Sequence, residues 1–231
     1  MGGSNRGLMI LTIISAVLLL AAAYGALAIA PSAIGLTPDE TAAQRIIYFH
    51  VPVAWLSMLA FGVTAIASVV YLITSKRLWD SVALSSAEIG FVFTLAAMAS
   101  GSLWAKPAWN TWWTWDPRLT TYTIMFLLYV AYFMLRSAMD DPARRARFAA
   151  VYGIFAFLSV PITFMSIRWW RTIHPVLIDP KSGFGLSKNM MPVFFLSLIA
   201  FTLFYFVLLI YRIRLERSRE QLDALKEQLG Y

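Results

Sequence analysis

The sequence predicts an all-α integral membrane protein with six transmembrane helices. Three observations support this fold class: 60% of the 231 residues are hydrophobic, only 13% are charged, and apolar runs long enough to cross a bilayer recur along the chain. The runs cover residues 8–30, 51–74, 85–103, 121–137, 148–167 and 190–211. They fill the sequence and leave no segment large enough for a soluble domain.

The first apolar run and the charged C-terminal segment are both predicted to be helices. The first run follows Arg6, as in a signal peptide, but it is longer than a signal-peptide core and five further spans follow, so we expect a retained helix. We divide the chain into a six-helix domain over 1–211 and a charged helical tail over 212–231. Leucines recur in this tail near helical spacing, which predicts a solvated or interfacial helix; docking to a partner is the alternative.

The distribution of basic residues predicts the orientation. With both termini inside, the inner segments contain twelve Lys and Arg residues and the outer segments contain seven. The positive-inside rule therefore predicts that both termini are cytoplasmic. The net charge of +7 reflects this topology and not a nucleic-acid-binding surface. Because the chain has no cysteine, disulfides, thiolate metal sites and cysteine nucleophiles are excluded.

The segments on the inner side carry no evident chemistry. We expect 75–84 and 138–147 to be plain connectors between spans. Ser85 and Glu88 form an S-x-x-E pattern at the start of the third span, which predicts a capping box and not a proton-relay acid. No Walker-type phosphate loop occurs, so nucleotide hydrolysis is not expected in this chain.

A tryptophan cluster marks the outer side. Residues 104–120 read WAKPAWNTWWTWDPRLT and contain five of the nine tryptophans: Trp104, Trp109, Trp112, Trp113 and Trp115. An interfacial belt needs only one or two aromatic rings at each end of a span. The cluster therefore predicts a wide, flat, apolar platform for a large planar ligand.

Both histidines of the chain also fall in outer segments. His50 lies at the mouth of the second span, two residues before Pro52, which we expect in the first helical turn; His174 follows the fifth span and precedes Pro175. A single histidine near a membrane interface is more often structural than a ligand. Two histidines beside an aromatic cluster, however, predict a haem site with two imidazole ligands.

Arginines on the same side can bind the two haem propionates. Arg45 and Arg118 are the preferred candidates because each lies close in sequence to a proposed haem-contacting motif, which Lys181 and Lys188 do not. For Arg168 and Arg171, contact with lipid headgroups is an equal alternative. We expect Asp116 to bond a tryptophan N–H or to pair with Arg118.

These motifs resemble a known family. WNTWWTWDPRLT resembles the WWD signature, W-G-x-x-W-x-W-D, of the haem-handling proteins of cytochrome c maturation: Trp109, Trp113, Trp115 and Asp116 match it. Asn110 replaces the glycine, and asparagine tolerates left-handed backbone better than most residues. RIIYFHVPVAW (45–55) and IHP (173–175) resemble the two histidine motifs that flank the signature. With six spans, the chain is similar in length to the haem exporter protein C (CcmC) family.

The resemblance implies a function in the bacterial inner membrane. Haem b is expected at the periplasmic face between His50 and His174, with the periplasmic Trp-rich WWD loop against the ring, and a CcmE-type periplasmic haem chaperone is expected to receive it. The implied partners are the ABC transporter subunits CcmA and CcmB, which would hydrolyse ATP, and a small CcmD-type subunit. The chain itself is expected not to be an enzyme.

Two other functions stay open on the sequence. The first is a haem-dependent quinone oxidoreductase of the membrane, although such proteins usually place histidines within their spans, and the predicted spans contain none. The second is a haem-free transporter or scaffold whose aromatic loop holds lipid or a partner. A hydrolase is disfavoured because no nucleophile–base–acid set is evident.

Overall fold

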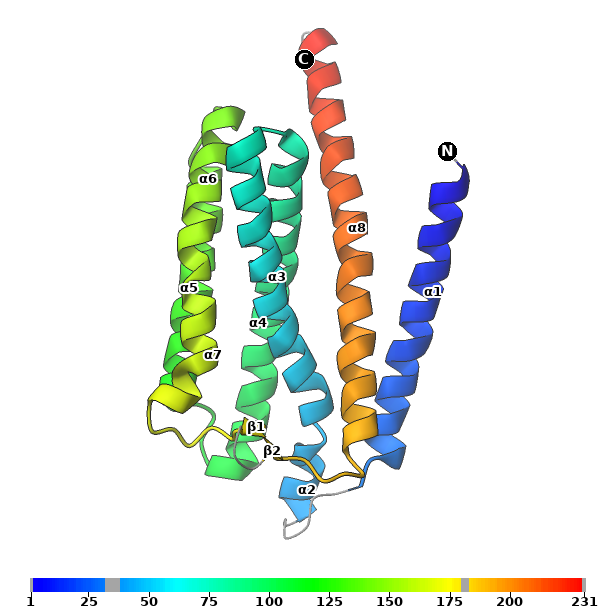
Figure 1. Ribbon diagram of the computed structural model, residues 1–231, viewed down its shortest axis with the longest axis vertical. Helices are drawn as coiled ribbons and strands as arrows, with labels where there is room; N and C mark the ends of the chain where they lie inside the picture. Colours follow the sequence, from blue (N-terminus) through cyan, green and yellow to red (C-terminus); the bar gives the residue numbers. More distant parts are fainter. Residues whose placement is uncertain (1, 32–37, 180–182, 230–231) are drawn as a thin grey trace.

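The computed structural model describes residues 2–31, 38–179 and 183–229 and is almost entirely helical (Figure 1). Its elements are α1 (Gly2–Tyr24), the π-helix η1 (Gly25–Ile29), α2 (Pro38–Gln44), α3 (Ile47–Thr74), α4 (Arg77–Trp109), α5 (Pro117–Ser137), α6 (Pro142–Phe157), α7 (Ser159–Trp169), β1 (Ile178–Asp179), β2 (Gly183–Phe184) and α8 (Met191–Leu229). In the described part of the chain, six helical segments are long and apolar enough to cross a membrane, as predicted.

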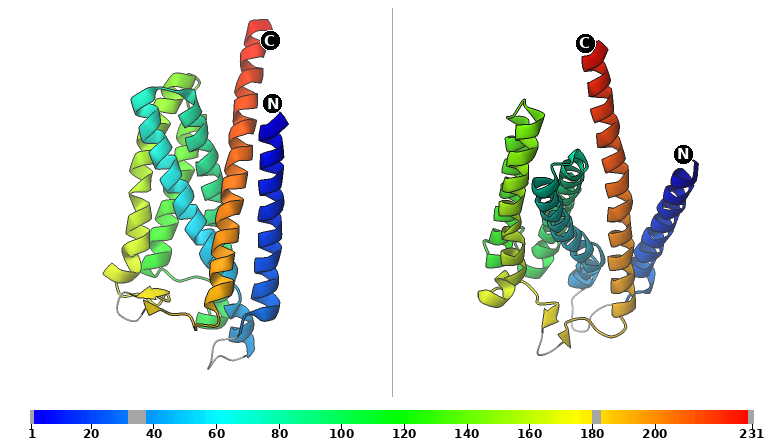
Figure 2. Two further views of the ribbon diagram at one scale, coloured as in Figure 1. Left: turned by 45° about the vertical axis from the view of Figure 1, so that its right-hand side comes forward. Right: turned by 45° about the horizontal axis from the view of Figure 1, so that its top comes forward.

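The helices form one bundle with two distinct ends. Helices α3 and α4 pack together at its centre, α5 to α7 lie on one side, and α8 lies on the other with α1 alongside it (Figures 1 and 2). Both chain ends lie at the same end of the bundle, which we call the termini end (Figure 1). The opposite end, the loop end, carries α2, β1 and β2 (Figure 1). An even number of spans produces this arrangement.

Small residues let the two central helices approach closely. A Cβ atom added at Gly90 of α4 would lie 2.9 Å from the Ala60 Cβ and 2.9 Å from Phe61 Cε1 of α3. Ser86 of α4 donates a hydrogen bond to the Ala60 carbonyl at 2.7 Å. Small side chains and interhelical hydrogen bonds favour helix association where lipid removes the hydrophobic driving force.

A break divides the fifth span, which the hydropathy predicted as one run. Helix α6 ends at Phe157 and α7 begins at Ser159, with Leu158 between them. Pro161 explains the break, because it has no N–H to donate and its ring clashes with the carbonyl four residues earlier, that of Phe157. Helix α7 then continues to Trp169 at the loop end.

Three expectations for the termini end are wrong. The predicted connector 75–84 is helical from Arg77 onward, and 138–147 is helical from Pro142 onward. Glu88 therefore lies roughly three turns inside α4 and is not part of a capping box. Its carboxylate instead pairs with Arg212 of α8, with the Nε atom 2.5 Å from Glu88 Oε2. Because Arg212 lies far from Glu88 in the sequence, the residues around Glu88 do not indicate that it forms this ion pair.

The charged tail continues the last span as a helix, as expected. Helix α8 runs from Met191 to Leu229 without interruption and carries the charged segment beyond the rest of the bundle (Figure 1). The tail leucines are more than half exposed: Leu215, Leu222, Leu225 and Leu229.

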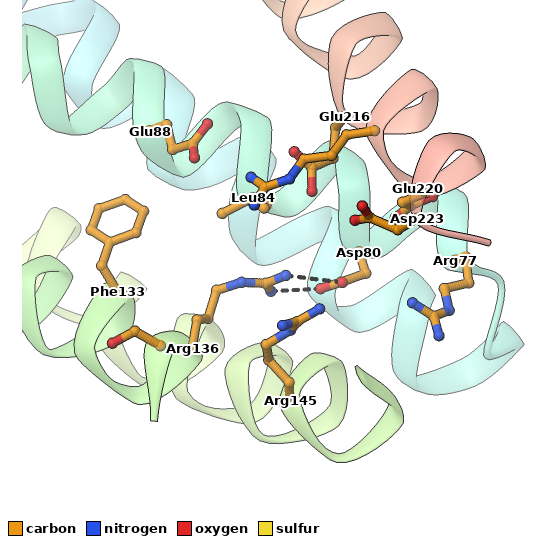
Figure 3. A pocket seen from close by; sticks show the side chains of 12 residues that line it. Arg77, Asp80, Leu84, Glu88, Phe133, Arg136, Arg145, Glu216, Glu220 and Asp223 are labelled. Atoms are coloured by element: carbon orange, nitrogen blue, oxygen red, sulfur yellow. Dashed lines mark hydrogen bonds and ion pairs between the residues drawn. The ribbon is translucent and has the colours of Figure 1, made fainter. Parts of the chain in front are cut away.

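A buried ion pair joins α4 to α5 near the termini end. Arg136 Nη1 lies 2.6 Å from Asp80 Oδ1, and Arg136 Nη2 donates to Asp80 Oδ2 at 3.0 Å (Figure 3). The two side chains are only 9% and 10% exposed. They line a cavity of about 410 Å³ that also receives carboxylates of α8, among them Glu216 and Glu220. The pair is thus largely removed from water.

Breaking this pair is expected to destabilise the bundle. Asp80→Ala leaves a buried guanidinium without its partner, which costs about 3–5 kcal/mol. Thermal unfolding in one detergent should show a lower midpoint for Asp80→Ala, and most of the loss should be recovered in a double variant, Asp80→Leu with Arg136→Met. A double variant as unstable as Asp80→Ala would contradict the assignment of the loss to an unpaired charge.

Candidate functional site at the loop end

A cavity of about 390 Å³ lies near the loop end, between α3, α4, α5, α7 and α8. Its wall is mainly apolar and aromatic, and includes Val51, Trp55, Met58, Trp104, Trp109, Trp113, Leu119, Phe164, Ile167, Leu177, Phe194, Phe195 and Leu198. The polar and cationic members of the wall are His50, Arg118, Tyr122, Arg168 and His174. Volume and lining are those of a site for a small molecule or cofactor.

Both histidines line this one cavity, although most of the chain's spans separate them in sequence. His50 lies in the first turn of α3, which begins at Ile47, and His174 lies in the irregular segment after α7. We expected Pro52 in the first turn of this helix, but it lies beyond that turn because the helix begins earlier than the apolar run. The structure thus brings the two predicted ligands together.

A serine and a glycine of α4 fix the ring of His50. The Ser100 hydroxyl donates to the Ala96 carbonyl at 2.7 Å, so its oxygen is left to accept from His50 Nδ1–H at 3.0 Å. Gly101 provides the space, since a Cβ there would lie 3.0 Å from His50 Cε1. This tautomer leaves Nε2 of His50 unprotonated and able to bind a metal.

His174 is in the same state. Its Nδ1 lies 3.1 Å from the Pro175 carbonyl, which can only accept, so Nδ1 carries the proton. Desolvation in the cavity wall, followed by the nearby Arg118 guanidinium, lowers the pKa of His174 to about 4. The imidazole is therefore neutral at pH 7, and its Nε2 has a free lone pair.

The tryptophans do not form a flat platform. Trp104 and Trp109 pack edge to face, with interplanar angle 80° and ring centroids 5.0 Å apart, and Trp113 and Trp115 do so at 81° and 6.1 Å. Such edge-to-face packing is a favoured arrangement of aromatic pairs. The expectation was wrong because the first two rings belong to α4 and the others to the loop that follows it.

The five rings divide by position. Trp104, Trp109 and Trp113 line the cavity, whereas Trp112 and Trp115 lie outside its lining and are 56% and 73% exposed. Helix α4 ends at Trp109 because Asn110 adopts the left-handed conformation, with φ 55°. This is the conformation that asparagine tolerates in place of glycine.

The arginines also separate into two groups. Arg118 and Arg168 line the cavity, and Arg118 donates through Nη1 to the Thr163 carbonyl of α7. Arg45 instead donates to the carbonyls of Ala26, at 2.5 Å, and Leu27, at 3.0 Å, both of which belong to η1. Arg171 and Lys188 are exposed. Lys181 lies outside the described residues.

Asp116 has a role that the sequence did not indicate. Its side chain accepts from the backbone N–H of Arg118 at 2.9 Å and so caps α5. It also accepts from the Thr172 hydroxyl, at 2.7 and 2.8 Å, and from the backbone N–H of Ile173 at 2.9 Å. Among the described residues, its hydrogen bonds reach neither a tryptophan N–H nor the Arg118 guanidinium, so that expectation is wrong. Asp116 joins the loop after α4 to the segment that carries His174.

Sequence reasoning missed several residues of this site, among them Ser100, Gly101, Tyr122 and Thr172. The only local signal was the Ser-Gly pair in the third span, since small residues mark close approaches between helices. The Tyr122 hydroxyl bonds to Ser57 at 2.8 Å, and this pairing joins residues of different spans.

The fold and the site together define a multi-pass helical membrane protein with two imidazoles in one aromatic cavity. The family model described as "Heme exporter protein C" (CcmC) matches residues 2–228. The chain belongs to the haem exporter protein C family, whose members are haem-handling membrane subunits of cytochrome c maturation and not catalytic enzymes. The resemblance drawn from the WWD signature is thereby confirmed.

Curated relatives agree with this assignment. The chain is 40% identical over 195 residues to heme exporter protein C of Bradyrhizobium diazoefficiens. The matched residues make up 83% of this chain and 74% of the relative. It is 34% identical over 177 residues to heme exporter protein C of Haemophilus influenzae, covering 76% and 72%. A putative cytochrome c biosynthesis ccmC-like mitochondrial protein of Marchantia polymorpha is 34% identical over 167 residues, covering 71% of each chain.

Proposed function

We propose that this chain binds haem b as cargo in the loop-end cavity and passes it to a periplasmic haem chaperone of the CcmE type. The observation that carries the proposal is that the only two histidines in the chain line one aromatic cavity. Imidazole is a common axial ligand of haem iron, and an apolar aromatic wall suits the porphyrin. His50 and His174 are the proposed axial ligands.

The protonation state of the two rings supports ligation. In each ring a hydrogen bond holds the proton on Nδ1, by Ser100 Oγ for His50 and by the Pro175 carbonyl for His174. Such a partner fixes the tautomer and makes the other nitrogen a better ligand. Each ring can therefore offer Nε2 to iron without first losing a proton.

The cations of the cavity suit the propionates. Arg118 and Arg168 line it, and a guanidinium can bind a carboxylate through two parallel hydrogen bonds. An unpaired carboxylate in an apolar setting is costly, so a haem held there needs such a partner. Arg118 is the proposed propionate ligand, with Arg168 as the second cation.

The charge pattern supports an orientation for the bundle. Basic residues are more numerous at the termini end, which by the positive-inside rule faces the cytoplasm. The cavity would then open on the periplasmic side of the bacterial inner membrane, where a chaperone can reach it. CcmA and CcmB subunits, which hydrolyse ATP, and a small CcmD-type subunit are the proposed partners, on the basis of family membership.

Transfer to the chaperone is the direct test of function. The purified, haem-loaded chain should lose its haem absorption when mixed with a soluble CcmE-type chaperone, while the chaperone gains haem. A soluble protein that does not bind haem is the control and should gain none. Haem that stays on the chain with the intact chaperone, under conditions where the two bind, would contradict the proposed function.

Gly101→Ala is expected to weaken haem binding by displacing His50. The added Cβ would lie 3.0 Å from the imidazole, so the ring must shift away from its position beside Ser100. We expect about a tenfold lower haem affinity, in line with other changes to residues that orient a metal ligand. Gly7→Ala is the matched control, because a Cβ at that helical glycine meets nothing within 4 Å. Equal haem titrations for the two variants would contradict the steric role of Gly101.

The two kinds of tryptophan are expected to behave differently. Trp113→Ala removes part of the cavity wall and should lower haem retention, whereas Trp115→Ala removes a ring that is 73% exposed and should mainly slow transfer to the chaperone. Haem off-rate and chaperone loading, measured on the same two preparations, check this division. If both variants retain and transfer haem normally, the cluster is an interfacial belt.

A further inference from the structure

We propose that Asp116 is a positioning residue that holds His174 at the cavity, and that it acts on the histidine segment instead of contacting the cargo. This inference rests on the proposed function, since it concerns how one of the two proposed iron ligands is placed. It assigns the aspartate of the WWD signature to the geometry of a histidine that lies far away in the sequence.

Two hydrogen-bonded steps lead from the carboxylate to His174. The Thr172 hydroxyl donates to both oxygens of Asp116, and the Ile173 N–H donates to Oδ2. Because the Thr172 proton is directed to the carboxylate, its oxygen is free to accept from the backbone N–H of His174, at 3.0 Å. Hydrogen bonds in such a chain polarise and strengthen one another.

The histidine segment, residues 170–177, has exposed apolar side chains on either side of His174. It lies between the end of α7 at Trp169 and β1 at Ile178, without helix or strand. Ile173 is 54% exposed and Val176 is 38% exposed, so apolar packing holds this part of the segment weakly. Asp116, by contrast, is only 9% exposed, and its carboxylate is itself held at the start of α5 by the Arg118 N–H.

The same carboxylate therefore sets two groups of the site. As the N-cap of α5 it fixes the first turn, which carries Arg118, and through Thr172 and Ile173 it fixes the backbone of His174. A substitution that moves Asp116, in the loop after α4, would thus also move the backbone of His174. The proposed propionate ligand and one proposed iron ligand share a single support.

Asp116→Asn is the informative change because it keeps the size of the side chain. An amide has one acceptor oxygen in place of two, and its NH₂ group cannot accept from the Thr172 hydroxyl or from the Ile173 N–H. Asp141→Asn is the matched control: Asp141 caps α6 by accepting from the Arg144 N–H at 2.6 Å, at the other end of the bundle. Any effect of losing a capping charge alone appears in both variants.

Amide hydrogen exchange on the haem-free chain tests positioning without using haem. The amides of Ile173 and His174 should exchange about tenfold faster in Asp116→Asn than in the wild type or in Asp141→Asn. The single amide oxygen cannot accept from both the Ile173 N–H and the Thr172 hydroxyl as the carboxylate does, and a Thr172 side chain that is no longer held is a poorer acceptor for the His174 N–H. Unchanged exchange at these two amides would overturn the proposal, whatever the chain does with haem.

The haem measurement then tests whether positioning matters for ligation. Asp116→Asn and Thr172→Val should each lower haem affinity about tenfold and weaken the low-spin spectrum of two axial imidazoles, while Thr172→Ser, which keeps the hydroxyl, restores both. In a His174→Ala background the effect of Asp116→Asn on haem affinity should be smaller than in the wild type, because only the part that acts through the first turn of α5 and Arg118 is left. An undiminished effect in that background would show that Asp116 acts elsewhere and would overturn the proposal. Wild-type chain without a two-imidazole haem spectrum would contradict the proposed function instead, and the exchange result would still decide positioning.

Discussion

Replacing His50 or His174 by alanine is expected to lower haem affinity by more than about 100-fold. Changes to groups that merely orient a metal ligand cost about 10- to 100-fold in affinity, and loss of the ligand itself should cost more. Haem titration and the visible absorption spectrum of the purified variants provide the measurement. Each single variant should lose the six-coordinate, low-spin spectrum and fail to support cytochrome c maturation in cells.

The chain offers a clean control for this experiment. It contains two histidines in all, so the double variant has no imidazole left to bind iron in place of the missing ones. Lys188→Ala, at an exposed position near the loop end, should bind haem like the wild type. A double variant that copurifies with haem showing the wild-type spectrum would contradict ligation by these residues.

Arg118→Ala is expected to raise the haem off-rate by about 10- to 100-fold, which corresponds to about 1.5–3 kcal/mol for a charge-assisted contact to a carboxylate. Arg118 lines the cavity, whereas the Arg45 guanidinium is bound to the carbonyls of Ala26 and Leu27. The sequence suggested both arginines as propionate ligands, but the structure separates them. Arg45→Ala is therefore the matched control and should leave the off-rate near that of the wild type.

One further comparison isolates the charge. Arg118 also donates to the Thr163 carbonyl, so the melting temperatures of Arg118→Ala and Arg45→Ala should be measured alongside the off-rates. If the two variants release haem at the same rate, Arg118 is not the propionate ligand.

The span number could be predicted from hydropathy because a bilayer demands long apolar helices. The span boundaries could not, because the helices continue past the apolar segments. Helix α4 begins at Arg77, where a charged turn includes Asp80, and the partner that allows Asp80 to be buried is Arg136 of another span. Pairs of this kind become visible only once the helices are packed.

The same limit applied to the site. His50, His174 and Trp113 were predicted to belong to one site because their residue types are rare and chemically specific, and the structure places all three on one cavity wall. The supporting residues were not predicted. Ser100 orients His50 from another helix, and Asp116 holds the segment of His174 through bonds to Thr172 and Ile173. Such roles depend on tertiary distances and not on local patterns.

Pulsed electron paramagnetic resonance of ferric haem bound to the chain, with its histidines labelled by ¹⁵N, tests the central claim most directly. Because the label enters only His50 and His174, each coupled ¹⁵N-imidazole can be assigned by single substitution. We predict two coupled imidazoles in the wild type, one in His50→Ala and one in His174→Ala. Haem coupled to neither histidine in the wild type would contradict the proposal that the cavity holds haem between them.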